Sequence, residues 1–347
     1  MTFFKSLPPN DLGHDFVVGD LHGKRRQLLA RLDALGFNPR RDRVFCTGDL
    51  IDRSPDSFDT LKLLHEPWFH FVRGNHDDDL PNFIDFEFSR FPGWRPAYCD
   101  QEWLYSLDSE QMEYLKTVLL PLLAAAPVVL RVEGERGFWM VHADRGEFAR
   151  YANPIPLLPD TDLPGASGDP QLESLLWSRR LFKQIPAREL EDRGLYQAVP
   201  HLELQTGVGL TFVGHSIVQQ PILYRSHLFL DTGEASGGPG LTVLRVTDIL
   251  NHKPSTALEK HRQSVPAIVA GCNCTNPRVF GSVLDGTDTF ASDLDLLVDP
   301  LENTTLFHLG RLQHTLLNLL KVRVQVVTPG DLPEKWRQTV LDEARPV

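Results

Sequence analysis

The stretch Phe16-Val17-Val18-Gly19-Asp20-Leu21-His22-Gly23 predicts a buried strand that ends in a tight turn carrying an aspartate and a histidine. Short apolar runs bounded by Gly and Asp are typical of buried strands. Four further phrases repeat this arrangement, because each follows an apolar run and brings polar side chains directly after it. They are Gly48-Asp49-Leu50-Ile51-Asp52-Arg53, Arg73-Gly74-Asn75-His76-Asp77, Val141-His142-Ala143-Asp144 and Gly214-His215.

Polar groups at the ends of several strands predict one shared site. In α/β sheets such groups can converge on a crevice beyond the strand ends. Carboxylate and imidazole ligands suit Mn, Fe or Zn, and pairs of divalent ions hydrolyse phosphate esters. Taken alone, each residue has a simpler explanation: turn or helix caps for Asp20 and Asp49, half-buried histidines for His142 and His215, surface ion pairs for Arg53 and Arg73. The five phrases together favour a dinuclear metal centre.

Composition excludes several classes of function. The chain has 347 residues, a hydrophobic fraction of 41% and a charged fraction of 23%, as expected for one large or two moderate globular domains. Its net charge of −11 provides no basic field for nucleic acid or an anionic membrane. No apolar stretch reaches the length of a membrane helix, and the apolar part of the N-terminus is too short for a signal peptide. The four cysteines follow no framework spacing, so reduced thiols in a cytoplasmic protein are expected.

The spacing of apolar residues predicts helices and two domains. Helices are expected over residues 27–36, 57–65 and 108–120, the last capped by Ser109. Residues 154–170 are rich in Pro, Gly and Asp and predict a loop, either a solvated connector or a segment that shapes substrate access. We expect a first domain over residues 1–247, a polar linker over 248–257 and a second domain over 258–347, which opens with a helix around 258–270.

Residues from about 14 to 247 resemble a bacterial member of the calcineurin-like phosphoprotein phosphatases, of the phage lambda type. The resemblance rests on the five ordered phrases, on Leu176-Trp177-Ser178-Arg179 and on Phe229-Leu230-Asp231-Thr232-Gly233. It implies an α/β sandwich of mixed β-sheets flanked by helices. It also implies a phosphomonoester hydrolase, most similar to serine/threonine phosphatases, that uses a hydroxide activated by two metal ions. Manganese is favoured, with iron or zinc as alternatives.

The resemblance also implies how the metals are held. Asp49 would bridge the two ions, and a proton donor would stand beside them without being a ligand. The ligands implied are Asp20, His22 and Asp49 for one metal, and Asp49, Asn75, His142 and His215 for the other.

Catalytic roles follow from the same resemblance. His76 would protonate the leaving group, and Asp52 would orient His76. The phosphate oxygens would be bound by Arg53, Arg73 and Arg179, because the planar guanidinium fork suits them. The chain departs from the family pattern at Ser54, where Gly is usual, and at Asp77, where Glu is usual. The acidic run 77–79 is expected to be a solvated helix start.

The second domain carries a different set of motifs. Gly281 and Ser282 stand before a short predicted helix, and Asp293 and Asp295 lie two apart on a predicted strand. These phrases and residues 321–333 resemble the minimal nucleotidyltransferases of the polymerase-beta superfamily, so a small C-terminal nucleotidyltransferase-like α/β domain is expected. The resemblance implies nucleotide phosphate at the helix start and Mg on the two aspartates.

Two departures affect the function expected of this domain. Gln325 stands where a third carboxylate is expected, and Asp285 stands where an arginine is usual. Glutamine is neutral, binds Mg less well and cannot act as a base. We therefore expect a nucleotide- or partner-binding module whose transfer activity is weak or absent.

Two alternatives to a protein phosphatase remain open. A dinucleoside polyphosphate hydrolase uses the same metal scaffold. A regulator of the antitoxin type would use the phosphatase domain to reverse a modification of a small helical, toxin-like partner, by analogy with minimal nucleotidyltransferases. The expected partners are therefore a phosphorylated protein and such a helical protein, with no nucleic acid and no membrane.

Overall fold

The computed structural model describes residues 3–85, 100–134, 137–144, 170–185, 210–224, 226–233, 238, 240–290 and 292–347. The described residues form two compact units, one up to Thr247 and one from Asp248 to Val347. No described helix combines the length and the apolar character that crossing a membrane requires. Residues 154–169 of the predicted loop lie outside the described residues.

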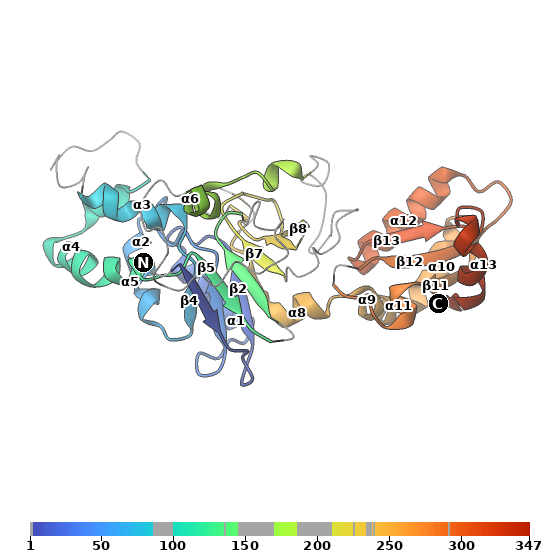
Figure 1. Ribbon diagram of the computed structural model, residues 1–347, viewed down its shortest axis with the longest axis horizontal. Helices are drawn as coiled ribbons and strands as arrows, with labels where there is room; N and C mark the ends of the chain where they lie inside the picture. The colour runs from blue at the N-terminus through green and yellow to red at the C-terminus, as the bar shows by residue number, and fades with distance from the viewer. Residues whose placement is uncertain are drawn as a thin grey trace. The chain divides into compact units, whose positions relative to one another are not determined.

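The N-terminal unit contains two β-sheets in which neighbouring strands are often far apart in sequence (Figure 1). The four-stranded sheet has the order β10 (Val243–Arg245), β2 (Asp15–Val18), β3 (Arg43–Cys46), β4 (Phe69–Phe71). The six-stranded sheet has the order β1 (Phe4–Leu7), β5 (Val129–Val132), β6 (Phe138–Val141), β7 (Thr211–Val213), β9 (His227–Phe229), β8 (Ile222–Tyr224). Strands β2, β3 and β4 are parallel, as are β6, β7 and β9. Their carboxyl ends therefore lie along one edge of each sheet.

The two sheets pack face to face through aromatic side chains. Phe45 of β3 contacts Phe138 of β6 with ring centroids 5.1 Å apart, and Phe138 contacts Phe212 of β7 at 5.2 Å. Successive side chains of a strand point to opposite faces, so Val44 and Cys46 point away from the other sheet, into an apolar core shared with helices. The structure confirms the predicted sandwich of mixed sheets flanked by helices.

Helices cover the outer face of the four-stranded sheet and bury leucines against it. They are α1 (Arg25–Ala34), α2 (Ser57–Leu61) with a 3₁₀ turn after it (Lys62–His65), α3 (Asn75–Phe83), the 3₁₀ helix η3 (Glu102–Ser106), α4 (Ser109–Tyr114), a π-helical turn (Leu115–Leu119) and α5 (Leu120–Ala124). Helices α2 to α5 lie together on the β4 side of the unit (Figure 1). After β6 the chain forms α6 (Pro170–Trp177) and a 3₁₀ turn (Phe182–Gln184).

The predicted helices at 27–36, 57–65 and 108–120 are found in place, but the predicted cap Ser109 is wrong. Asp108 is the N-cap, because its backbone is extended and its carboxylate accepts a hydrogen bond from the Gln111 N–H at 2.8 Å. Ser109 is already the first helical residue. An aspartate directly before a serine therefore takes the cap.

The C-terminal unit is a small α/β unit built on one mixed sheet. The strand order is β13 (Val324–Val327), β12 (Leu294–Pro300), β11 (Cys274–Phe280), β14 (Arg345–Pro346), with β12 parallel to β13 and antiparallel to β11. One apolar core joins the sheet to α9 (Pro254–His261), α10 (Val265–Gly271) and α12 (Leu306–Leu320). The remaining helices are α11 (Ser282–Asp285) and α13 (Glu334–Glu343).

Residues 248–257, expected to be a polar linker, are helical over most of their length. Helix α8 (Val246–Asn251) includes the first of them, and α9 begins at Pro254, where a proline is tolerated because no intrahelical N–H bond is needed. Ala257 is buried in the C-terminal core. The helix expected around 258–270 is interrupted by a 3₁₀ turn (Arg262–Ser264) just before Pro266, which removes the backbone donor of a continuous helix.

Candidate metal centre

The predicted metal ligands follow the carboxyl ends of five strands drawn from both sheets. Asp20 and His22 follow β2, Asp49 follows β3, Asn75 begins α3 after β4, His142 follows β6 and His215 follows β7. All six side chains are buried. The fold therefore brings together every ligand that the sequence predicted, from positions up to 195 residues apart.

Several of these residues sit in a backbone conformation that L side chains rarely adopt. His22, Asp49 and His215 have φ values of 40°, 46° and 61°. Such strain persists only where the surroundings fix it, and it is often found at functional sites. A side chain on Gly74 would overlap the Asp49 carboxylate, and one on Gly214 would overlap the carboxylate of Asp20. Gly74 and Gly214 are thus required by close approach to predicted ligands.

Each of the three histidines among the predicted ligands has one ring nitrogen hydrogen-bonded to a backbone carbonyl. Nδ1 of His22 and Nδ1 of His142 lie 2.8 Å from the carbonyl oxygens of Ile51 and Thr47, and Nε2 of His215 lies 3.1 Å from that of Trp177. A carbonyl accepts only, so these nitrogens carry the protons. The other nitrogen of each ring points into the cluster, which is how metal-binding histidines are oriented.

These second ring nitrogens face the acidic and amide groups of the cluster. Nε2 of His22 and Nε2 of His142 lie 3.7 and 3.4 Å from the Asp49 carboxylate, and Nδ1 of His215 lies 2.9 Å from the Asn75 side-chain oxygen. Possible ligand atoms form two groups, and within each group they all lie within 4.8 Å of one another. The groups are His22, Asp49 and His76, and Asp49, His142 and His215. Asp49 belongs to both groups, as a bridging ligand would.

The charges of the cluster fit divalent cations. Asp20, Asp49 and Asp231 are all buried, and the ion pairs that the described residues give to Asp20 and Asp49 are with histidines rather than Lys or Arg. Burying several carboxylates is costly unless positive charge compensates them. The donor set of carboxylate, imidazole and amide oxygen suits Mn, Fe or Zn.

The pKa values of the cluster reflect the same buried negative charge. Burial raises the pKa of Asp20 well above its usual value, and Asp231 and Asp49 add to the rise. Burial lowers the pKa of His22 to about 4 and that of His215 to about 3, so both rings are neutral at pH 7. Burial also opposes a charge on His142, but Asp49 and Asp20 outweigh it and raise its pKa to about 10. A bound cation would take over the compensation that this proton provides.

His76 and Asp52 form a hydrogen-bonded pair beside the cluster. Nδ1 of His76 donates to Asp52 at 2.7 Å, and the His76 ring contacts the His22 ring edge-on with centroids 5.0 Å apart. Burial would lower the pKa of His76, but the hydrogen bond to Asp52 and the charge of Asp49 outweigh it and raise the pKa. The geometry thus gives His76 two possible uses, as a ligand with His22 and Asp49 or as a proton donor oriented by Asp52.

The three predicted phosphate-binding arginines lie in different surroundings. Nη2 of Arg53 is 3.2 Å from Nε2 of His76, and Nη2 of Arg179 donates to the His215 carbonyl at 3.3 Å. Both arginines are exposed, so they border the site from the solvent side. Arg73 is buried and paired with Asp78, with Nε and Asp78 Oδ1 3.1 Å apart. Its Nε and Nη2 both have no hydrogen-bond partner among the described residues, which leaves two nitrogens that could donate to a ligand.

Sequence reasoning gave no role to two buried residues of the centre. Asp231 lies two residues after β9, much as the predicted ligands follow their strands, and the same sequence pattern marks it. Asp77, expected at a solvated helix start, is buried: its carboxylate accepts the N–H of Leu50 and that of Gly74, each at 2.9 Å. It thereby links the loop of Asp49 to the loop of Asn75. Burial and the charge of Asp49 raise its pKa to about 7.

The predicted site of the C-terminal unit is less complete. Asp295 lies opposite Gln325 on β13, and burial raises its pKa to about 6. Asp293 lies one residue before β12 and forms an ion pair with Arg323. Gly281, with φ of 70°, precedes α11, a helix of only four residues that begins at Ser282. Among the described residues of this unit, no three acidic, histidine or cysteine ligands converge.

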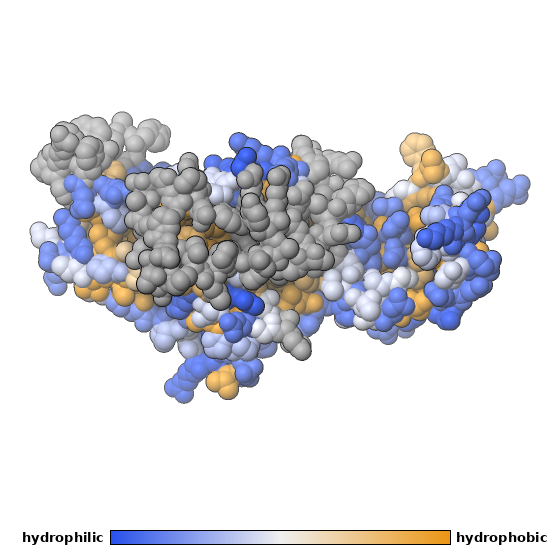
Figure 2. Space-filling model, viewed as in Figure 1, coloured by the Kyte–Doolittle hydropathy of each residue, from blue (hydrophilic) through white to orange (hydrophobic). Residues whose placement is uncertain are grey.

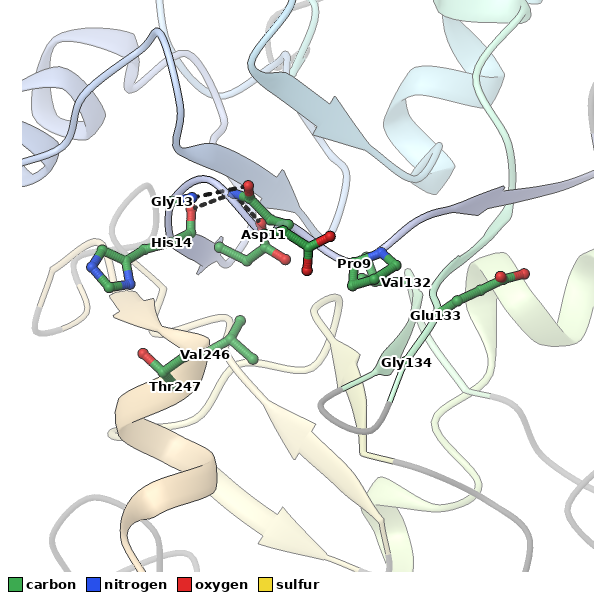
Figure 3. Close-up of a pocket in the computed structure, with 11 residues that line it drawn as sticks. Pro9, Asp11, Gly13, His14, Val132, Glu133, Gly134, Val246 and Thr247 are labelled. Atoms are coloured by element: carbon green, nitrogen blue, oxygen red, sulfur yellow. Dashed lines mark hydrogen bonds between the residues drawn. The ribbon is translucent and has the colours of Figure 1, made fainter.

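Two pockets differ in their relation to the metal centre. One, of about 480 Å³, is lined by Arg53, Asp100 and Trp103 among others, and so adjoins His76. The other, of about 450 Å³ (Figure 3), lies at the amino end of β2 between the loop before that strand, the end of β5 and Val246. No predicted site residue lines it in the described part of the chain, so only the first pocket belongs to the site.

A two-sheet sandwich with these buried ligands at its strand ends defines a metallophosphoesterase. Residues 16–218 match the family model of the calcineurin-like phosphoesterases, and the chain belongs to this family. It is 29% identical over 226 residues to serine/threonine-protein phosphatase 2 of Salmonella typhimurium, covering 65% of this chain and 89% of that protein. Family membership makes the chain a metal-dependent phosphoesterase.

Two shorter similarities concern other activities. Over 64 residues the chain is 44% identical to the symmetrical bis(5'-nucleosyl)-tetraphosphatase of Nitrosomonas europaea, which covers 18% of this chain and 24% of that protein. A solved structure named as a candidate minimal nucleotidyltransferase is 39% identical and covers 28% of this chain and 99% of that one, with a TM-score of 0.27.

Proposed function

We propose that the N-terminal unit is a protein phosphatase that removes phosphate from serine and threonine. The observation that carries this proposal is the His76–Asp52 pair, which stands beside the metal ligands with Arg53 next to it. The alkoxide of serine or threonine is a poor leaving group, so its cleavage needs a proton donor at this place. The long similarity to a serine/threonine-protein phosphatase also supports the proposal.

The residues of the chain divide the reaction between them. Two divalent ions, for which we propose manganese, would be held by Asp20, His22, Asp49, Asn75, His142 and His215 and would supply Lewis-acid charge and an activated water. Hydrolysis joins the water oxygen to phosphorus and breaks the bond between phosphorus and the ester oxygen. His76 gives the departing oxygen its proton from Nε2, and Asp52 stabilises the ring while it is charged. Arg53, Arg73 and Arg179 hold the phosphate oxygens.

The present position of Arg53 has a consequence for substrate binding. Its guanidinium donates toward Nε2 of His76 at 3.2 Å, so the nitrogen that must carry the proton is engaged. A phosphate dianion is a stronger acceptor than a neutral imidazole. Binding of the substrate would therefore draw Arg53 onto the phosphate and leave Nε2 free to be protonated.

Hydrolysis of dinucleoside polyphosphates is the second candidate. The 64-residue match to a tetraphosphatase has a higher sequence identity, 44%, than the 226-residue match to a serine/threonine-protein phosphatase, 29%. We expect the purified chain with Mn to hydrolyse a phosphoserine peptide with a kcat/KM at least about tenfold above that for diadenosine tetraphosphate, a difference of about 1.4 kcal/mol in transition-state binding. Both rates are measured by release of product at equal enzyme and metal concentrations. The reverse order would assign the site to dinucleotides.

We also propose that the C-terminal unit binds nucleotide but transfers it weakly or not at all. Arg323 already neutralises Asp293, and Gln325 stands beside Asp295 where a further carboxylate would complete a metal site. With Mg and radiolabelled ATP, the full chain should incorporate little label into itself or into added protein. Strong labelling that disappears in Asp293→Ala would show that the site is active as it stands.

An antitoxin-type regulator of a helical partner is the third candidate. Leu306 and Phe307 at the start of α12 are 84% and 90% exposed, and Figure 2 shows apolar side chains at the surface of the C-terminal unit. Exposed apolar patches often mark protein contacts. Co-expression with a small helical protein, followed by purification of a complex that Phe307→Ser weakens, would support this proposal. A complex unaffected by Phe307→Ser would count against this surface.

A further inference from the structure

The carboxylate of Asp52 is held by more than His76. It is completely buried, and each of its oxygens accepts a hydrogen bond from the segment that follows residue 100. Nε1 of Trp103 donates to Oδ1 at 2.8 Å, and Nε2 of Gln101 donates to Oδ2 at 3.0 Å, beside the 2.7 Å bond from His76. We infer that Trp103 and Gln101 are positioning residues for the proton donor, an inference that rests on the proposed phosphatase function.

The two donors act on different degrees of freedom of the carboxylate. The last torsion of an aspartate side chain is broad, so a carboxylate bound only to His76 could rotate and tilt the imidazole with it. The Trp103 bond occupies the oxygen that His76 does not use, and this fixes the plane of the carboxylate. The Gln101 bond shares the oxygen of His76 and offsets its charge. Nε2 of His76 is thereby aimed along one direction.

The segment is itself anchored firmly enough to serve this purpose. Trp103 and Leu104 are 3% and 0% exposed and belong to the apolar core of the helical layer. Side chains locked by core packing can hold a catalytic group in place. The indole therefore cannot follow Asp52 if that residue moves, and instead resists its movement.

The same segment also holds the backbone around Asp52. Asp52 and Arg53 have φ values of 73° and 61°, two consecutive residues in the left-handed region. The Arg53 N–H donates to the carbonyl of Asp100 at 3.0 Å, and the Asp52 N–H donates to Ser57 at 2.9 Å. This strained turn presents both the dyad carboxylate and a phosphate-binding guanidinium. Residues 100–103, together with Ser57, thus set the position of both.

The experiment compares two substrates that differ in their need for a proton. In a phosphoserine peptide the leaving group is the serine alkoxide, which requires a proton. In p-nitrophenyl phosphate the leaving group is nitrophenolate, which is a stable anion. Trp103→Phe keeps the aromatic ring and removes the donor. It should lower kcat on the peptide by roughly tenfold to a hundredfold, the worth of a hydrogen bond to a charged group, with kcat on p-nitrophenyl phosphate changed less than about twofold. KM should be unchanged for both.

A matched control separates this role from a loss of packing. Trp68→Phe makes the same change at another buried tryptophan, whose Nε1 donates to Glu66 at 2.9 Å away from the dyad. It should lower both rates equally or not at all. Gln101→Met provides a second variant at a half-buried position, should Trp103→Phe not fold, and is expected to act in the same direction.

A double-mutant cycle tests whether Trp103 acts through the dyad. In a His76→Ala background the proton donor is gone, so Trp103→Phe should have no further effect on the peptide rate. Two results would overturn the inference and make Trp103 a packing residue. One is that Trp103→Phe lowers the rates on both substrates equally, and the other is that it lowers the peptide rate in the His76→Ala background as much as it does alone. Failure of the wild-type chain to hydrolyse the peptide would instead reject the proposed function, while activity on p-nitrophenyl phosphate alone would still report an intact metal centre.

Discussion

Replacement of His76 by alanine is expected to lower kcat on a phosphoserine peptide by about 10²–10⁴-fold, the range that a positioned proton donor contributes. The serine oxygen then leaves without the proton that His76 would supply. The metal content should stay at the wild-type value if His76 is the donor, because the ring is bonded to Asp52 rather than committed to an ion. Steady-state kinetics with elemental analysis of the purified variant measures both quantities.

His65→Ala is the matched control for that result. His65 is an exposed histidine of the same unit, and its ring is hydrogen-bonded to Tyr114 at 2.8 Å. Its removal should leave both kcat and metal content unchanged. If His76→Ala instead loses metal in proportion to its activity, His76 is a ligand beside His22 and Asp49, as their clustering would also allow.

Asp49→Asn is expected to remove both metal ions together. Asp49 is the one carboxylate shared by the two ligand groups, and it is 2% exposed. Losing its charge should weaken the binding of each ion by at least about 10–100-fold, since changes at residues that only support a ligand already cost this much. Hydrolysis of p-nitrophenyl phosphate should fall to background for the same reason. Elemental analysis after gel filtration without added metal reports the occupancy.

Asp59→Asn serves as the control for the loss of a charge. Asp59 is a half-exposed surface residue whose carboxylate pairs with Arg25 and Lys62, each at 3.1 Å. Surface ion pairs contribute little, so metal content and rate should match the wild type. An Asp49→Asn protein that kept two equivalents of metal would refute the bridging assignment, and one that kept a single equivalent would place Asp49 on one ion only.

The sequence predicts the candidate ligands because each lies within a few residues of a strand end. An apolar run followed by a polar residue predicts Asp20, Asp49 and His142. This pattern is local in the sequence and does not depend on tertiary structure. The burial of Asp77 could not be read in this way, since it depends on two loops meeting around one carboxylate. Trp103 lies 51 residues from Asp52, and nothing in its own neighbourhood marks it as a partner.

The same distinction explains the corrections to the secondary structure. The expected linker over 248–257 was inferred from polarity, but Ile249 and Ala257 are buried, the latter in the C-terminal core, and tertiary packing decides the helices. The cap at Asp108 rather than Ser109 is a local choice between neighbouring residues that both favour the position. Element type is thus set by periodicity, while element ends depend on contacts that a single window of sequence does not contain.

The division of the ligands between the two sheets has a consequence for how the enzyme is made. A ribosome delivers the N-terminus first, so Asp20, His22, Asp49 and Asn75 exist in the growing chain well before His142 and His215 are synthesised. An ion that meets this early chain finds an incomplete set of ligands. The backbone N–H of His215 donates to Asp20 across 195 positions, so the full set of predicted ligands comes together when the second sheet is in place. Metal uptake would then mark the moment at which the newly made chain is correctly assembled.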